Sequence, residues 1–153
     1  MISLDWIIQL VTAFIGSFCF GILFNMRGKR LIISAVEGLF AWTCYLILNI
    51  FIKSDILNYF LSALLVSGFS QISAKLLKSP ASTFTTIAII PLVPGSSLYY
   101  TMAYAFQGIS EKFFEKGIYT LKVAAALALG TLLTTAITKF IVGHKKIRLS
   151  ELS

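Results

Sequence analysis

The sequence predicts an all-α integral membrane protein, in which residues 1–153 form a single transmembrane domain with about five helices. Two properties of the composition lead to this fold class: hydrophobic residues make up 58% of the chain, and charged residues only 12%. The mean hydropathy is correspondingly high, at +0.88. A chain of this composition could not present a polar surface to water, whereas its long apolar runs are suited to a bilayer.

The apolar runs divide the chain into five predicted spans, because a helix needs about 20 residues to cross the hydrocarbon core of a membrane. The predicted spans cover residues 4–24, 31–52, 56–77, 80–106 and 118–143. The segments between them are short. Almost the whole chain is therefore expected to lie in the membrane.

Small residues in the first and fifth spans predict where helices pack closely. They recur every four residues, so each set lies on one face of its helix. The sets are Ala13, Ser17 and Gly21 in the first span, and Ala126, Gly130, Thr134 and Thr138 in the fifth. Small side chains let two membrane helices approach, and hydroxyl groups add hydrogen bonds between them.

The second span carries one acidic residue, Glu37, about six residues or roughly 9 Å from its start. The same face of the helix holds Ser34, Gly38, Ala41, Tyr45 and Asn49. This face is expected to point into the bundle, and an ionisable residue there is a functional candidate by default. Two interpretations remain open: Glu37 couples transport to a proton, or it forms a structural ion pair with Lys75 or Lys139.

The third span has the most polar face of the uninterrupted helices. That face is formed by Ala63, Ser67, Ser70, Gln71 and Ala74. One interpretation is helix packing supported by hydrogen bonds between helices. The other is a transport pathway, in which Gln71 would contact the substrate.

The fourth span contains a break, because Pro91, Pro94 and Gly95 lie inside a stretch apolar enough to cross the bilayer. Hydrocarbon offers no water to the freed backbone groups, so such a break persists only where protein or a water-filled cavity receives them. Transporters build substrate sites from helices interrupted in this way. A second half-helix is predicted to start around Gly95 to Ser97 and to run to about Phe106.

The start of that half-helix is a candidate carboxylate site, since its first N–H groups lack helical partners and carry the positive end of the helix dipole. Ser96 and Ser97 add hydroxyl groups there. Tyr100 and Tyr104 lie four residues apart on one face, with phenol groups that would reach a polar ligand. The alternative is a proline-kinked helix with tyrosines at the membrane interface.

Basic residues indicate the orientation of the chain. Nine of them lie in alternate loops and the C-terminal tail: Arg27, Lys29, Arg30, Lys75, Lys78, Lys139, Lys145, Lys146 and Arg148. The positive-inside rule therefore predicts that the N-terminus is outside and the C-terminus is in the cytoplasm. The net charge of +7 does not indicate a nucleic-acid partner, because no basic patch with interleaved aromatic residues is present.

The residue inventory disfavours an enzyme, because no nucleophile, base and orienting group can be assembled from it. No cofactor and no metal site are expected. Cys19 and Cys44 form no paired motif, and His144 has no neighbouring cysteine or carboxylate that would complete a metal site.

Residues 90–102 read Ile-Pro-Leu-Val-Pro-Gly-Ser-Ser-Leu-Tyr-Tyr-Thr-Met. This segment resembles the signature of the threonine/serine exporter family, specifically of its short YjjB-like half subunits, and the length, spans and basic tail agree over the whole chain. The family pattern has a further glycine after the Pro-Gly pair, where this chain has Ser96. The resemblance implies the bacterial inner membrane, assembly into a higher oligomer, and a longer YjjP-like partner with a soluble region that is absent here.

The resemblance and the residues together predict a membrane subunit of a secondary exporter. Its substrates would be small carboxylate-bearing metabolites, namely threonine and serine or a dicarboxylate such as succinate. The alternative is a structural or assembly subunit that stabilises a partner without lining the path. A holin-like pore is disfavoured by the break in the fourth span and by the number of spans.

Overall fold

The structure, a computed structural model, describes the backbone of residues 4–150 and the side chains of residues 4–141. The first three helices are α1 (Leu4–Leu23), α2 (Lys29–Phe51) and α3 (Asp55–Leu76). They are followed by α4 (Ala81–Ile89), the 3₁₀ turn η1 (Ile90–Leu92), α5 (Gly95–Phe106) and α6 (Ser110–Ser150). The all-α fold is thus confirmed for the described residues.

Helix lengths agree with the predicted spans. Helices α1, α2, α3 and α6 are each long and apolar enough to cross a membrane. The segments Ala81–Leu92 and Gly95–Phe106 pass the same test as a pair bent by 61°, and they make a fifth span if they are counted as one. The protein is therefore a multi-pass membrane protein.

The last helix differs from the prediction, because it begins at Ser110 instead of near residue 118. Gly108, with φ 69°, ends the preceding turn, and Glu111 in the first turn of α6 complements the helix dipole. The charged residues that precede the predicted fifth span therefore lie on the helix itself, namely Glu111, Lys112, Glu115 and Lys116. With 41 residues, α6 is roughly 60 Å long, about twice the thickness of a hydrocarbon core.

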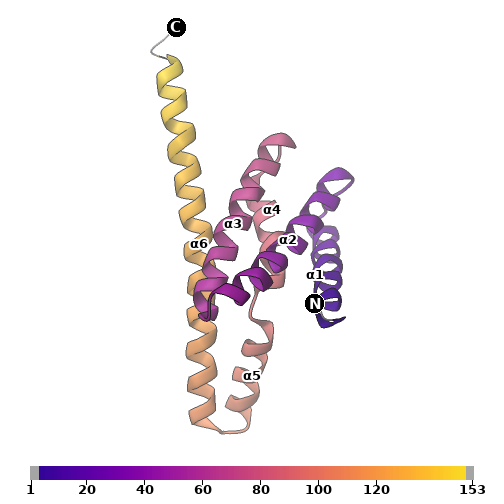
Figure 1. The fold of residues 1–153 in the computed structure, drawn as a ribbon, viewed down its shortest axis with the longest axis vertical. Coiled ribbons are helices and arrows are strands. Elements are labelled where there is room, and N and C mark those ends of the chain that lie inside the picture. Colours follow the sequence, from indigo (N-terminus) through magenta and orange to yellow (C-terminus); the bar gives the residue numbers. More distant parts are fainter. Residues whose placement is uncertain (1–3, 151–153) are drawn as a thin grey trace.

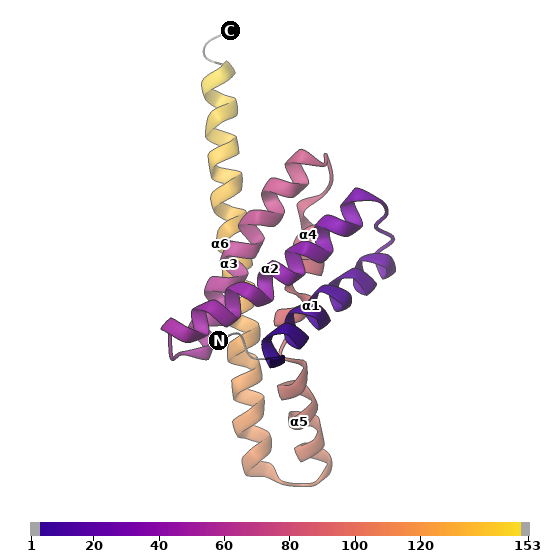
Figure 2. The same ribbon diagram turned by 45° about the vertical axis from the view of Figure 1, so that its right-hand side comes forward.

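The helices pack as a chain of neighbours in which α2 lies between α1 and α3, and α3 contacts both α4 and α6 (Figures 1 and 2). Helix α5 turns away from this body and packs against the first half of α6. In both views these two segments form a hairpin that projects beyond the α2–α3 turn. The break in the fourth span is thus where the chain leaves the packed body.

The small residues of the first and fifth spans lie at helix contacts, as predicted. A Cβ atom added to Gly21 would lie 2.5 Å from Cδ1 of Leu31, and one added to Gly130 would lie 2.7 Å from the carbonyl oxygen of Phe60. Thr134 donates a hydrogen bond of 3.1 Å to the carbonyl oxygen of Leu64 on α3. These contacts hold α1 to α2 and α6 to α3.

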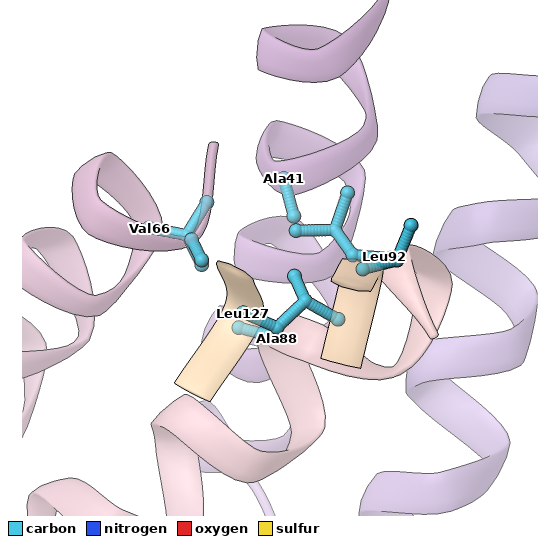
Figure 3. Packing of buried hydrophobic residues seen from close by; sticks show 7 residues of the cluster. Ala41, Val66, Ala88, Leu92 and Leu127 are labelled. Atoms are coloured by element: carbon cyan, nitrogen blue, oxygen red, sulfur yellow. The ribbon is translucent and has the colours of Figure 1, made fainter. Parts of the chain in front are cut away.

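A buried apolar cluster joins α2, α3 and α6 to the end of α4 and to η1, in the first half of the broken span. Figure 3 shows its central side chains, which are Ala41, Val66, Ala88, Leu92 and Leu127. In a bilayer, lipid tails are as apolar as these groups, so the cluster stabilises the fold mainly through close van der Waals packing. It fixes η1 against the body just before the chain bends away.

Candidate functional site

The break in the fourth span has the form that its prolines dictate. Because Pro91 and Pro94 lack an N–H group, they cannot donate to the carbonyls four residues earlier, those of Ile87 and Ile90. Both carbonyls accept hydrogen bonds locally instead: Ile90 donates to Ile87, and Val93 donates to Ile90 over 3.2 Å. The 3₁₀ turn thus satisfies these two acceptors, and α5 starts afresh at Gly95.

The first turn of α5 leaves backbone donors free. Gly95 is not one of them, contrary to the prediction, because its N–H donates to the carbonyl of Val93 over 2.7 Å. Among the described residues no acceptor is found for the N–H groups of Ser96 and Ser97. Ser96 is exposed and Ser97 is half-buried, so the turn that carries these donors lies at the surface of the described structure.

The two predicted tyrosines lie one turn further along α5. The rings of Tyr100 and Tyr104 stack with their centroids 6.3 Å apart, and Tyr99 meets Tyr100 edge-on at 5.5 Å. The side chain of Tyr100 is 51% exposed. On the other side, Nζ of Lys112 lies 5.6 Å from the ring centre of Tyr104. The structure therefore gathers these side chains into an exposed aromatic surface next to the free donors.

Gln71 does not join this group. It lies on α3 near the opposite end of α4, where it lines a groove with Ala81 and Lys139. The predicted substrate-binding residues thus fall into two places, with Pro91 to Tyr104 at the break and Gln71 apart from them.

Glu37 is completely buried, with 0% of its surface exposed. Ser70 on α3 donates a hydrogen bond of 2.7 Å to its Oε2 atom, while its Oε1 atom has no hydrogen-bond partner. The ion pair with Lys75 or Lys139 is not found in the described part of the chain, because both lysines are exposed and the carboxylate is enclosed by helices. The surroundings of Glu37 are hydroxyl groups instead of cations.

The position next to Glu37 connects this buried cluster to the break. A Cβ atom added to Gly38 would overlap Oγ of Ser17 and would lie 3.5 Å from Cγ of Pro91. Oγ of Ser17 is itself buried and without a hydrogen-bond partner. Helix α2 is thus wedged between α1 and the first proline of the break, one residue from the buried carboxyl group.

A second polar pair lies beside the break and was not predicted from the sequence. Trp42 donates a hydrogen bond of 3.1 Å from its indole N–H to Oε1 of Gln9. Together with Thr12, Ala13 and Pro91 these side chains line a hollow of about 280 Å³. The available signal was the amide of Gln9 inside an otherwise apolar first span.

The site holds no metal-binding cluster, since no group of three or more histidine, cysteine or carboxylate side chains occurs within the described residues. The side chain of His144 lies outside the part that the structure describes. Cys19 and Cys44 are both free thiols.

Comparison with known proteins identifies a family. The family model described as "Threonine/Serine exporter, ThrE" matches residues 9–137, a range that includes Gln9, Glu37 and the break in the fourth span. No curated protein and no solved structure matches the chain.

Proposed function

Since the chain belongs to the threonine/serine exporter family, which makes it an exporter-type membrane transporter, we propose that it is the membrane subunit of a secondary exporter of small carboxylate-bearing metabolites. Threonine and serine are the first candidates, and a dicarboxylate such as succinate is the next. Its role is transport, not catalysis, and residues 1–153 act as one transmembrane domain.

The observation that carries this proposal is the pair of free backbone donors at the start of α5. The N–H groups of Ser96 and Ser97 lie at the positive end of a helix, inside a span that the bilayer would otherwise require to be continuous. A carboxylate is the ligand that such donors favour. The hydroxyl groups of these serines and of Tyr100 would form hydrogen bonds with the amino and hydroxyl groups of a hydroxy amino acid.

A partner is part of the proposal, because the break is open on one side. Nothing lies within 4 Å of a Cβ atom added to Gly95, and Tyr99 and Tyr100 are exposed. A substrate bound there by this chain alone would remain in contact with its surroundings. We assign the covering surface to a longer YjjP-like subunit, and assembly of the pair into a higher oligomer is compatible with the exposed face.

Glu37 is proposed as the coupling residue. A carboxyl group gains or loses a proton without any change in its heavy atoms, and an unpaired charge in a buried site is costly. Gly38, the residue next to Glu37, packs against Ser17 and Pro91. A change of charge at Glu37 would therefore alter the contact between α1, α2 and the break.

The orientation is proposed to be that of a bacterial inner-membrane protein with its N-terminus outside and its C-terminus in the cytoplasm. In support, Arg30 in the first turn of α2 donates a hydrogen bond of 3.4 Å to the carbonyl of Leu77 at the end of α3. The two basic loops that were assigned to the cytoplasm therefore meet at one end of the bundle.

Efflux of preloaded, labelled threonine tests the function. Cells that make both subunits should export it, whereas cells that make either subunit alone should export little. Transport by the purified chain alone in liposomes would refute the need for a partner. Export by the partner alone, once another membrane protein stabilises it, would instead assign this chain to the structural or assembly class.

A further inference from the structure

A groove lies between α4 and α6, and its lining residues are different from those of the break. Helices α4 and α6 each pack against α3, which forms the floor of the groove and lies between them in Figure 1. The cavity has a volume of about 500 Å³. Its polar lining includes Gln71, Lys139, Ser82 and four threonines, namely Thr85, Thr86, Thr131 and Thr135.

The polar groups of the groove are largely unused by the protein. In the described part of the chain, the side chains of Gln71, Thr85 and Lys139 make no hydrogen bond or ion pair with another residue. Thr131 and Thr135 donate to carbonyls of their own helix over 2.9 and 2.8 Å, so their hydroxyl oxygens can still accept a hydrogen bond from a ligand. The groove thus offers an ammonium group, an amide and hydroxyl groups to a ligand.

The charge of the groove selects the kind of ligand. Lys139 is the single charged side chain among the lining residues, and no carboxylate lies among them to neutralise it. A neighbouring hollow of about 310 Å³ shares Gln71 and Ala81 with the groove and adds Lys75 and Lys78. The two cavities together form a positively charged groove that extends from the basic end of the bundle into the membrane-spanning part.

We propose that this groove, which runs along α4 from Ala81 to Ile89, is a second binding site for the carboxylate of the exported amino acid. The inference rests on the proposed function. Lys139 binds the carboxylate, and Gln71 with the threonine hydroxyls binds the polar groups on the other side of the substrate. A volume of this size lies within the usual range of roughly 300–1,000 Å³ for small-molecule sites.

Helix α4 joins the two sites. It has nine residues, so its length is roughly 14 Å, about half the thickness of the hydrocarbon core. A substrate that passes from the groove to the break therefore moves along one short helix. The groove is the entry site on the basic side, and the break is the site from which the substrate leaves.

Protection of an engineered cysteine tests the proposal. The reporter is Thr135→Cys in the Cys19→Ser, Cys44→Ala background, labelled with a water-soluble thiol reagent in membranes from the native cells, where any partner is present. Threonine should slow labelling, whereas threoninol, which lacks the carboxylate, should not. Lys139→Gln should raise the half-protecting threonine concentration by about tenfold to a hundredfold, the effect of losing a hydrogen bond to a charged group. Lys122→Gln, an exposed lysine of the same helix, should leave it unchanged.

Two further reporters separate the possible failures. Gln107→Cys, in the α5–α6 turn, controls for non-specific effects, and Ser97→Cys reports on the break. If threonine protects position 97 but not position 135, the groove is not a substrate site and the proposed function survives. If neither position is protected and the cells export no threonine, the proposed function itself fails.

The groove chemistry would also suit the headgroup of an anionic lipid, so the source of the anion is tested separately. In liposomes of phosphatidylcholine alone, threonine should still protect position 135. If addition of phosphatidylglycerol suppresses labelling while threonine has no effect in either lipid, the groove is a lipid site and the proposal is overturned.

Discussion

The buried carboxyl group of Glu37 and the start of α5 are both polar features inside membrane spans, yet their surroundings are opposite. Glu37 is completely buried, with Ser70 on α3 as its hydrogen-bond donor. Ser96 and Ser97, whose N–H groups lack acceptors among the described residues, lie in an exposed turn close to the exposed ring of Tyr100.

This difference indicates what each site can exchange. The helices around Glu37 leave no room for a small molecule, since even a methyl group on Gly38 would overlap Ser17. A proton is the ligand that such a site can still take up. The start of α5, in contrast, is exposed, so a substrate bound there would need a second surface to enclose it. The closed site is therefore suited to coupling, and the open one to binding.

The largest expected effect follows from removing the titratable group of the closed site. Glu37→Gln keeps an oxygen that accepts the hydrogen bond from Ser70 but cannot gain or lose a proton. Gradient-driven export should be abolished, while exchange of labelled for unlabelled substrate should continue. The two activities are measured on the same vesicles, with and without an imposed pH gradient.

The matched control is Glu115→Gln, since Glu115 is an exposed carboxylate on α6. It should leave both activities unchanged. If Glu37→Gln vesicles export normally over a range of pH, Glu37 is structural and the comparison between a coupling site and a binding site does not hold.

The open site is tested by closing the break. Pro91→Ala together with Pro94→Ala restores two backbone donors, and an interior proline disfavours a helix by about 3 kcal/mol. The double variant should therefore be at least as stable as the unmodified protein but should lose export. Thermal unfolding in detergent and threonine efflux are measured side by side.

The same variant also has a structural readout. The amide groups of Ser96 and Ser97 should become protected from hydrogen exchange once the helix is continuous. A double variant that inserts, assembles and exports at the unmodified level would mean that the break serves packing, and the substrate site would then lie along Ser67 and Gln71.

The break could be predicted from sequence because its cause is local. Pro91, Pro94 and Gly95 favour an interruption of the helix through their own chemistry, and the half-helix predicted to start around Gly95 to Ser97 corresponds to α5, Gly95–Phe106. The small-residue faces were predicted for a similar reason, since spacing alone places Ala13, Ser17 and Gly21 on one side of a helix.

Features that depend on which helices meet could not be predicted in this way. The partner of Glu37 is Ser70, 33 residues away in the chain, and no spacing rule favours it over Lys75. The groove around Gln71 exists because α4 and α6 pack on the same helix without touching along its length. The hydrogen bond from the N–H of Gly95 to the carbonyl of Val93 depends on the turn that two closely spaced prolines adopt.

The smallest expected effect tests how tightly the closed site is packed. Gly38→Ala gains about 1 kcal/mol of helix propensity, but overpacking typically costs about 1–3 kcal/mol. Oγ of Ser17 could rotate away, whereas its Cβ, 2.5 Å from the added methyl group, moves only if α1 shifts from α2. Since the two effects oppose each other, the net change in the free energy of unfolding should be a loss of up to about 2 kcal/mol. Gly16→Ala, with nothing within 4 Å of the added atom, should be neutral or stabilising. Chemical denaturation of both variants in one detergent compares them, and equal stabilities would mean that the α1–α2 contact yields easily, so that the site around Glu37 is not closed.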